Sequence, residues 1–325
     1  MKSMHFAKAL LLVGAGMLAL ASARLSAQEY PNRPIRIVNG LAGGPVDIQS
    51  RMVARELEAR LKQKVLVEAK VGAGGLIAHR EIARSKPDGY TLLFATAQLA
   101  GGIVSSKDPQ YKLEDFVYLA PVSISGLAMM VSSSVPVNSV HEFIEYAKTN
   151  PGQLNYASLG AGGTPMLAAE RLKHAGNFEM THIAYRGSPQ AHQEVLAGRA
   201  HVYFSGAGNA KVGMQASAGR IKILAIASAS RSKFLPDVPT FKELGYPVMT
   251  STWNIMAGPA GMPRSITQRL RDALAEILAS AEIERDLEKV GVDPWRLSLD
   301  QLEAFIKADV EQTKADFTRL KIPLE

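Results

Sequence analysis

A serine and a lysine three positions apart are the first candidates for chemistry in this sequence. Ser230 and Lys233 match S-x-x-K, a pattern in which the serine hydroxyl attacks an acyl group. The S-D-N and K-T-G patterns that accompany it in serine-acylating enzymes occur nowhere in the 325 residues. Four-residue patterns of common residues arise by chance, so we interpret this match as a solvated loop.

Other catalytic signatures are missing from the sequence. The dinucleotide pattern G-x-G-x-x-G fails at its third glycine in both GAGGLI (72–77) and GAGGTP (160–165), and no Gly-Lys pair is present for a P-loop. The elbow G-x-S-x-G is also missing. The seven histidines show no metal-binding spacing, and there is no cysteine. We therefore expect no enzymatic activity, no cofactor and no metal site.

Glycine-rich turns offer a different chemistry. Three of them, at 39–47, 70–75 and 158–165, follow a strand-like run and precede a helix-like one. Glycine lets backbone N–H groups face a ligand without a Cβ in the way, and a helix that starts there adds unpaired N–H donors and the positive end of its dipole. Such helix starts bind anions in general. Tight turns alone would also use glycine, but three turns of one design favour a small anion held between two parts of the chain.

An alternation of strands and helices must position these turns. Apolar runs at 35–38, 64–69 and 91–97 are typical of strands, and 75–86 is typical of a helix. Between the first two strands, apolar residues recur at helical spacing, namely Ile48, Met52, Val53, Leu57 and Leu61. The order β-α-β-α-β predicts a parallel sheet covered by helices.

The middle of the chain repeats this organisation. Strand-like runs at 154–160, 180–187 and 200–206 alternate with helix-like runs, and Ser139 is placed to cap a further helix at 139–148. Helical stripes follow near the C-terminus. Strands near 120–131 and 221–228 are suited to cross between the two modules, so the sequence predicts an α/β protein with two lobes.

The N-terminal residues have the pattern of an export signal. Two lysines precede an apolar run at 9–23, and small residues permit cleavage after Ala23 or Ala27. The run of about 15 residues is shorter than the roughly 20 that a spanning helix needs. We expect residues 1–27 to be removed and the mature protein to be periplasmic and soluble.

The charge balance gives no sign of a nucleic-acid partner. The chain carries 37 basic and 30 acidic residues, and loss of residues 1–27 removes three basic ones, which leaves 34 against 30, a net charge of +4. The basic residues are interspersed with acidic ones, whereas a nucleic-acid surface requires clustering. We expect no nucleic-acid partner and a monomeric protein.

Several long segments of the chain resemble one family. YPNRPIRIV (30–38) is close to the family's start, and the likeness continues through KPDGYTLLFAT (86–96), LNYASLGAGGTPMLAAE (154–170) and WNIMAGPAGMP (253–263). On these motifs the chain resembles the Bug family of periplasmic solute-binding proteins, the TctC-like receptors of tripartite tricarboxylate transporters. The resemblance covers essentially the whole chain after the signal segment.

The resemblance implies a two-lobe α/β periplasmic binding protein of the Venus flytrap kind, type II-like, in which each lobe is a mostly parallel sheet flanked by helices. Residues 28–124 and 229–325 are expected to form the first lobe, and residues 125–228 the second. Family ligands are small organic acids: dicarboxylates, tricarboxylates, aromatic carboxylates and acidic amino acids. Backbone amides and bridging waters hold their carboxylates, here at the turns 40–47 and 158–166.

The ligand-binding candidates come from these two turns and from further family-like positions. For Arg186 the alternative is a solvated loop charge, although a guanidinium beside an anion would be a strong partner. The full set is Gly40, Leu41, Ala42, Gly43, Gly44, Asp47, Thr96, Ala97, Ser158, Ala161, Gly162, Gly163, Thr164, Arg186, Gly187 and Ser205.

The sequence departs from the family pattern in three places. Asn39 replaces a proline and Gly40 an aromatic residue, which removes a pocket wall and suggests a changed or larger ligand. Ser205 stands where an aspartate is common, so a ligand ammonium loses a partner and we expect a plain carboxylate rather than an amino acid. Met166 stands where many members have histidine.

The resemblance implies a receptor that delivers an organic carboxylate to the membrane subunits of a tripartite tricarboxylate-type permease. The alternative is a receptor that docks on the periplasmic ectodomain of a sensor kinase. The sequence identifies neither the ligand nor the partner.

Overall fold

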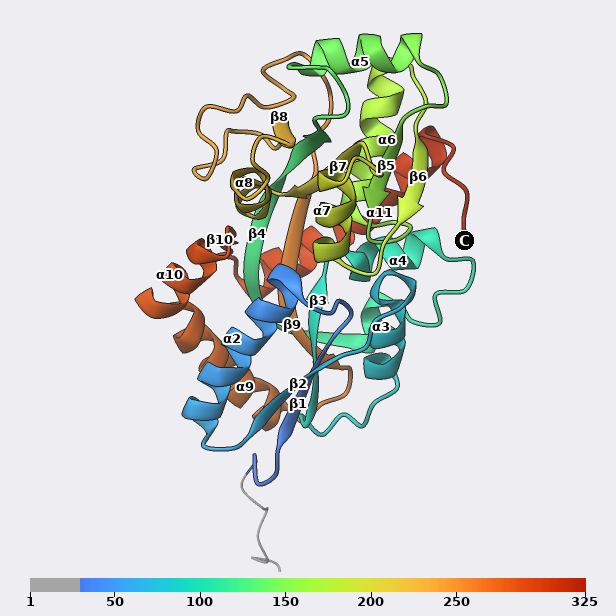
Figure 1. Cartoon of the computed structure of the whole chain (residues 1–325). Helices are drawn as coiled ribbons and strands as arrows, with labels where there is room; N and C mark the ends of the chain where they lie inside the picture. The colour runs from blue at the N-terminus through green and yellow to red at the C-terminus, as the bar shows by residue number, and fades with distance from the viewer. Residues whose placement is uncertain (1–29) are drawn as a thin grey trace, which may run out of the picture.

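One long strand belongs to both of the sheets on which the molecule is built. The computed structural model describes residues 30–325. In Figure 1 one sheet lies in the lower half and the other in the upper half, and β4 (Phe116–Ser132) runs through both. The expected signal segment, residues 1–27, lies outside the described residues.

The first sheet has the strand order β2-β1-β3-β9-β4. Its strands are β1 (Ile35–Asn39), β2 (Val65–Ala69), β3 (Thr91–Thr96), β9 (Ser251–Pro259) and residues 116–126 of β4. The first three are parallel, as the β-α-β-α-β pattern predicts, whereas β9 is antiparallel to both of its neighbours. The two-residue strand β10 (Asp293–Pro294) pairs with β4.

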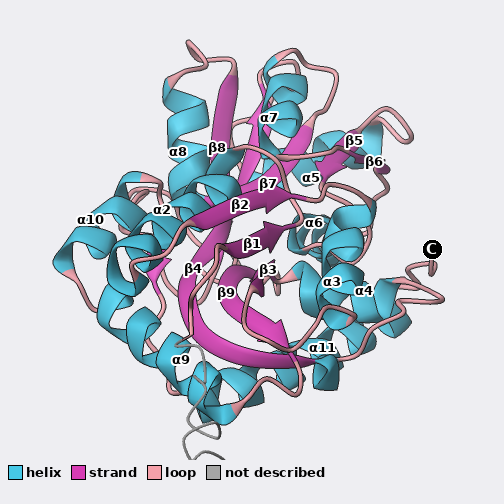
Figure 2. Ribbon diagram, turned by 90° about the horizontal axis from the view of Figure 1, so that it is seen from below, coloured by secondary structure: helices cyan, strands magenta, loops and turns pink. Residues whose placement is uncertain are grey.

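Helices cover both faces of the first sheet (Figure 2). One face carries α2 (Gly44–Leu61), α9 (Arg264–Leu278) and α10 (Ala281–Lys289), and the other carries the turn η1 (Ala73–Gly75) with α3 (Leu76–Ala83), α4 (Gln98–Ser105) and α11 (Leu299–Arg319). Successive strand residues point to opposite faces. Leu92 and Phe94 therefore join the core under α2, and Leu93 and Ala95 join the core under α3.

The second sheet is built in the same way around the other end of β4. Its parallel strands are β5 (Asn155–Ser158), β6 (Thr181–Ala184) and β7 (Val202–Gly206). β4 is antiparallel to β7 on one side and to β8 (Ile221–Ala227) on the other. The helices of this half are α5 (Val140–Thr149), α6 (Thr164–Gly176), α7 (Ser188–Leu196) and α8 (Ala207–Gln215). The turn η2 (Leu113–Asp115) precedes β4.

Two connections carry the chain between the sheets. β4 pairs with β9 up to Gly126 and with β7 and β8 from Leu127 onward. The return differs from the prediction, because β8 pairs with residues 127–132 of β4 and, among the described residues, with no strand of the first sheet. Residues 228–250 make the return, and β9 then enters the first sheet with Ser251 opposite Gly126.

Local sequence signals explain where the helices begin. Ser139 caps α5 as predicted, since its Oγ accepts a hydrogen bond from the backbone N of Glu142 at 3.1 Å. Pro45 and Pro165 lie in the first turns of α2 and α6, where a missing N–H breaks no helical hydrogen bond.

Two glycine-containing helices, α4 and α8, are not predicted by the sequence pattern, because glycine has a low helix propensity. Close packing accounts for these glycines. A Cβ added to Gly101 of α4 would lie 2.0 Å from the carbonyl oxygen of Gly162, and one added to Gly208 of α8 would lie 2.1 Å from Cα of Gly291. Both contacts join an element of one sheet to an element of the other.

The buried face of α2 is also shifted from the expected stripe. Val53, Leu57 and Leu61 are buried as predicted, but Ile48 is 45% exposed. Gln49, one turn before Val53, occupies the buried face instead and is 1% exposed. A glutamine at such a position requires hydrogen-bond partners inside the protein.

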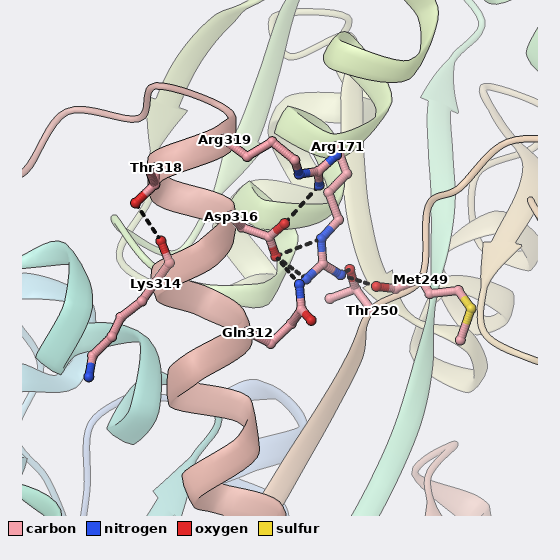
Figure 3. A network of polar contacts seen from close by, with 8 residues as sticks. All are labelled: Arg171, Met249, Thr250, Gln312, Lys314, Asp316, Thr318 and Arg319. Carbon is pink, nitrogen blue, oxygen red and sulfur yellow. Dashed lines mark hydrogen bonds and ion pairs between the residues drawn. The ribbon is translucent and has the colours of Figure 1, made fainter.

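A buried ion pair ties α6 to α11 (Figure 3). The Arg171 guanidinium on α6 donates to the Asp316 carboxylate on α11, to the carbonyl oxygen of Met249 and, at 2.7 Å, to Thr250 Oγ1. Arg319 Nη2 donates to Asp316 Oδ1 at 2.8 Å. Burial raises the pKa of the fully buried Asp316, but the hydrogen bonds from Arg171 and Arg319 outweigh it and hold that pKa below its ordinary value.

From residue 30 onward, no helix combines the length and the apolar character that crossing a membrane requires.

Candidate ligand-binding cleft

The first glycine turn is held in shape by its own side chains. Gly43 and Gly44 have φ values of 66° and 69°, which glycine adopts without strain. The buried Asn39 amide accepts from the backbone N of Leu41 at 3.1 Å and donates to Ser50 Oγ at 3.0 Å and to Asp47 Oδ1 at 3.3 Å. The asparagine that replaces the family's proline therefore braces the turn from beneath.

The second-lobe turn is braced in a similar way. Ser158 Oγ accepts from the backbone N of Gly160 at 3.0 Å and lies 2.5 Å from His182 Nε2. Burial lowers the pKa of His182, so the imidazole stays neutral and acts as a hydrogen-bonding structural residue. The turn leads directly into α6, whose first residue is Thr164.

The second-lobe turn reaches the first lobe across the gap between the sheets. Gln98 Nε2 on α4 donates to the carbonyl oxygen of Ala161 at 2.6 Å, and Ser105 Oγ donates to the same oxygen at 3.2 Å. A Cβ on Gly160 would lie 3.0 Å from Cα of Gly74. The structure therefore has the turn 158–163 in contact with η1 and α4 of the first lobe.

A cleft of about 730 Å³, including the part that opens to solvent, lies between these elements. Its walls come from both sheets and from the helix starts that follow them. The lining residues are Leu41, Pro45, Val46, Gln49, Gly74, Thr96, Ala97, Gln98, Leu127, Leu159, Gly163, Thr164, Pro165, Ser188, Tyr203, Phe204, Ser205, Gly206, Asn209, Thr252, Asn254 and Val292.

The cleft brings together six of the sequence candidates. These six are Leu41, Thr96, Ala97, Gly163, Thr164 and Ser205. A second hollow adjoins the cleft and shares Leu41, Gly74 and Leu159 with it; Gly40, Ala161 and Arg186 line this hollow. The backbone N of Arg186 donates to Gln190 Oε1 at 3.3 Å.

The other candidates lie outside these two spaces. Gly162 lines a third hollow, near Arg171. Asp47 uses its carboxylate inside the first lobe, where it accepts from Asn39 and from Arg51 Nε at 3.0 Å. Ala42, Gly43, Gly44, Ser158 and Gly187 line none of the three spaces and form the turns behind them.

Several polar side chains of the cleft have no counterpart among the candidates. Among them are Gln49, Gln98, Ser188, Tyr203, Asn209 and Asn254. Gln49 could have been found, since it precedes Val53, Leu57 and Leu61 at a spacing of four and places an amide on an apolar stripe. The other five sit in runs whose spacing carries no such signal.

The cleft is lined by neutral groups. Within residues 30–325, its lining contains hydroxyls, amides and backbone but no Asp, Glu, Lys, Arg or His side chain. Behind it, Ser205 Oγ lies 3.2 Å from His192 Nε2 and accepts from Asn209 Nδ2 at 2.9 Å. Burial lowers the pKa of His192 to about 4, so this histidine is neutral at pH 7. An anion in the cleft would meet hydrogen-bond donors rather than a cation.

The S-x-x-K match lies in a surface network of ion pairs. Lys233 Nζ is 2.6 Å from Glu288 Oε1 and 3.0 Å from Asp293 Oδ1. The hydrogen bond to Glu288 raises the pKa of Lys233, which opposes the use of this lysine as the base for a serine. The interpretation of this match as chance is consistent with that geometry.

The fold and the cleft define a class: two α/β lobes with a cleft between them are the architecture of a solute-binding protein. The profile of the family described as Tripartite tricarboxylate transporter family receptor matches residues 49–321, and the chain belongs to this family. The predictions of a Bug/TctC-like protein and of a two-lobe α/β fold are confirmed. The family consists of receptors and not of enzymes.

Related sequences and structures agree with this assignment. A UPF0065 protein of Cupriavidus necator is 32% identical over 98% of both chains, and the protein BugT of Bordetella pertussis is 32% identical over 90% of both. The solved structure of the periplasmic binding protein BugD has a TM-score of 0.83 at 28% identity and covers 90% of this chain and 99% of its own. An R. palustris protein solved with adipate has a TM-score of 0.85 at 26% identity and covers 91% of this chain and 99% of its own.

Proposed function

We propose that this protein is an exported receptor that binds a small organic carboxylate in the cleft between its lobes. The observation that carries the proposal is the pair of glycine-rich helix starts, before α2 and α6, that both line one cleft without charged side chains among the described residues. Helix starts of this kind bind anions through backbone N–H groups, which suits a lining without cations. The adipate in the R. palustris neighbour supports a carboxylate ligand.

The binding residues in this proposal are the six sequence candidates in the cleft, with Gly40, Ala161 and Arg186 at the adjoining hollow. Ala42, Gly43, Gly44, Asp47, Ser158, Gly162 and Gly187 have the role of shaping the two turns. Residues 28–124 and 229–325 form one lobe and residues 125–228 the other. The change of partner along β4 between Gly126 and Leu127 supports the first of these boundaries.

Delivery to a tripartite tricarboxylate-type permease is the role that the family description supports. The protein then acts in the periplasm as a monomer after removal of residues 1–27. Uptake of the ligand by cells that lack only this protein decides the role: loss of uptake supports delivery, whereas normal uptake with loss of a transcriptional response supports a sensor ectodomain as the partner.

The binding proposal is tested by thermal unfolding of residues 28–325 with aliphatic, tricarboxylic and aromatic acids. The protein is first unfolded and refolded to remove any bound ligand. An acid at a hundred times its dissociation constant adds roughly 2.7 kcal/mol to the native state. The expected result is a rise of several degrees in Tm for at least one class of acid. No shift with any acid would overturn the proposal.

A further inference from the structure

Three polar side chains from three elements form a buried cluster at the wall of the cleft. Ser123 Oγ of β4 donates to Gln49 Oε1 of α2 at 2.6 Å, and Asn254 Nδ2 of β9 lies 2.9 Å from Ser123 Oγ and 3.3 Å from Gln49 Oε1. Ser123 is fully buried, and Gln49 and Asn254 are 1% and 4% exposed. Gln49 and Asn254 both line the cleft.

This cluster leaves two of its polar atoms unused. Gln49 Nε2 and Asn254 Oδ1 are buried and have no hydrogen-bond partner within residues 30–325. One is a donor and the other an acceptor. Exchanging nitrogen and oxygen in both amides together preserves the three contacts within the cluster and again leaves one donor and one acceptor. The unused pair is therefore set by the positions of the side chains and not by the orientation assigned to each amide.

A donor beside an acceptor selects the chemistry of its partner. A carboxylate can only accept, so it would satisfy the donor and repel the acceptor; an ammonium can only donate and would fail in the opposite way. A hydroxyl or a carboxamide does both. Buried polar groups that remain unpaired are costly, and a site built to hydrogen-bond a ligand group discriminates strongly against analogues that lack it.

We propose that Gln49 and Asn254, held in place by Ser123, recognise a neutral group of the ligand that both donates and accepts hydrogen bonds, a hydroxyl or a carboxamide. This inference rests on the proposed function, in which the glycine turns hold the ligand's carboxylate. It assigns the ligand to the class of hydroxy acids or monoamides of dicarboxylic acids. The absence of charged side chains from the described lining of the cleft agrees with a neutral second group.

A purely structural role is the competing explanation for the cluster. The three side chains join α2 to the floor of the first sheet, and such a bond would stabilise the fold whatever the ligand. A structural role predicts that removing Gln49 changes stability but leaves the ranking of ligands unchanged. The two explanations therefore differ in a measurable quantity, the ratio of dissociation constants between matched acids.

The test measures dissociation constants by calorimetry for acids that differ only at the far end. One series is adipate, its monoamide, 6-hydroxyhexanoate, 6-aminohexanoate and hexanoate, and the second is the corresponding four-carbon series. The expected result is that the amide or hydroxyl acid of at least one series binds at least tenfold more tightly than both the diacid and the plain acid, a difference of about 1.4 kcal/mol. In Gln49→Met, which keeps the length of the side chain, this preference should fall to within about threefold, because the amide that made the selective hydrogen bond is gone.

Controls separate this inference from the function on which it rests. Gln268→Met changes a glutamine on α9 that bonds Asp272 at the surface, and the ranking should not change. If Gln49→Met does not fold, Asn254→Leu tests the same site. Binding of acids with the diacid preferred, or an unaltered ranking in the folded variant, overturns the inference and leaves the receptor proposal standing. Binding of no acid in either series or in the wider acid screen overturns both.

Discussion

The two regions where the lobes meet differ in the kind of contact that joins them. Beside the cleft, the contacts are uncharged: the backbone of Gly101 lies against Gly162 and that of Gly208 against Gly291, and Gln98 and Ser105 donate neutral hydrogen bonds to Ala161. On the side of α6 and α11, the contact is the ion pair of Arg171 with the fully buried Asp316 (Figure 3). Glycine contacts leave no unpaired charge when they separate, whereas separating a buried ion pair does. We therefore expect the lobes to open at the glycine contacts while the region around Arg171 stays together.

The largest expected effect is a loss of stability on removal of the Arg171–Asp316 ion pair. Arg171→Met removes the guanidinium and leaves the Asp316 carboxylate buried with only its weaker partners. Loss of one partner of a buried pair costs about 3–5 kcal/mol, and the lower figure applies here because Arg319 still donates to Asp316. Urea unfolding measures the loss.

The control for this variant replaces both partners. Arg171→Met with Asp316→Leu leaves no charge unpaired and should recover much of the stability lost in the single variant. If the single variant loses less than about 1 kcal/mol, the value of a surface pair, the ionic region is not the stronger of the two.

A second prediction separates the two regions by pH. His79 lies behind the glycine turn 72–75, and complete burial lowers its pKa to about 3. Because the unfolded histidine takes up a proton near its ordinary pKa of about 6.5, the stability from the neutral buried form is present above that pH and lost as the pH falls toward 3. The pKa of Asp316 is also lowered, but its contribution begins to fall only near the ordinary carboxylate value of about 3.9.

As the pH falls from 6.5 to 4, the stability that comes from the region of the glycine contacts should therefore decrease before the stability that comes from the Arg171–Asp316 ion pair. Unfolding free energies at pH 7 and pH 5 should differ by about 2 kcal/mol from His79 alone. In His79→Gln, which does not titrate, that part of the slope should disappear, although the variant is less stable at pH 7. An unchanged slope would show that His79 does not stay neutral when the protein is folded.

The smallest expected effect is on closure itself. Gly208→Ala places a methyl group where the backbone of Gly291 lies, so the closed form is hindered. The expected result is a loss of about tenfold in affinity for the acid found by thermal unfolding, which corresponds to roughly 1.4 kcal/mol. Calorimetry measures the affinity, and small-angle scattering with ligand should report a more open molecule.

Gly213→Ala is the matched control, because it makes the same change on the same helix. The nearest neighbours of an added Cβ there are Met130 and His192, both within the second lobe. This variant should keep its affinity and gain up to about 1 kcal/mol of stability, since alanine favours the helix. Equal affinities in the two variants would contradict a role for Gly208 in closure.

Sequence patterns predict most of the fold. The parallel strands β1, β2 and β3, the helix cap at Ser139 and the prolines at the starts of α2 and α6 follow from local signals, and the two-lobe fold is confirmed. The sequence pattern does not predict the helices α4 and α8, because their glycines have a low helix propensity. These glycines are explained by contacts with the other lobe, which a local pattern cannot show. The sequence pattern gives Gln49 no role, because it places the buried stripe of α2 at Ile48, one position away.

The candidate site is predictable only in part for the same reason. The glycine turns carry a local signature, so the sequence finds their place, and the cleft contains Leu41, Gly163 and Thr164 from them. Asn254 and Ser123 are 131 residues apart and meet Gln49 only because β9 and β4 are neighbours in the sheet. Arg171 and Asp316 are 145 residues apart, and local sequence patterns do not predict their contact either.

The position of β9 between β3 and β4 sets an order of assembly. Both neighbours of β9 are made well before it, so the first sheet has a missing centre until residues 251–259 arrive. The second sheet, by contrast, is complete once β8 ends at Ala227. A nascent chain can therefore finish its middle portion first and its N-terminal portion last. A chain that stops near residue 250 would expose two unpaired strand edges, which are sites for aggregation.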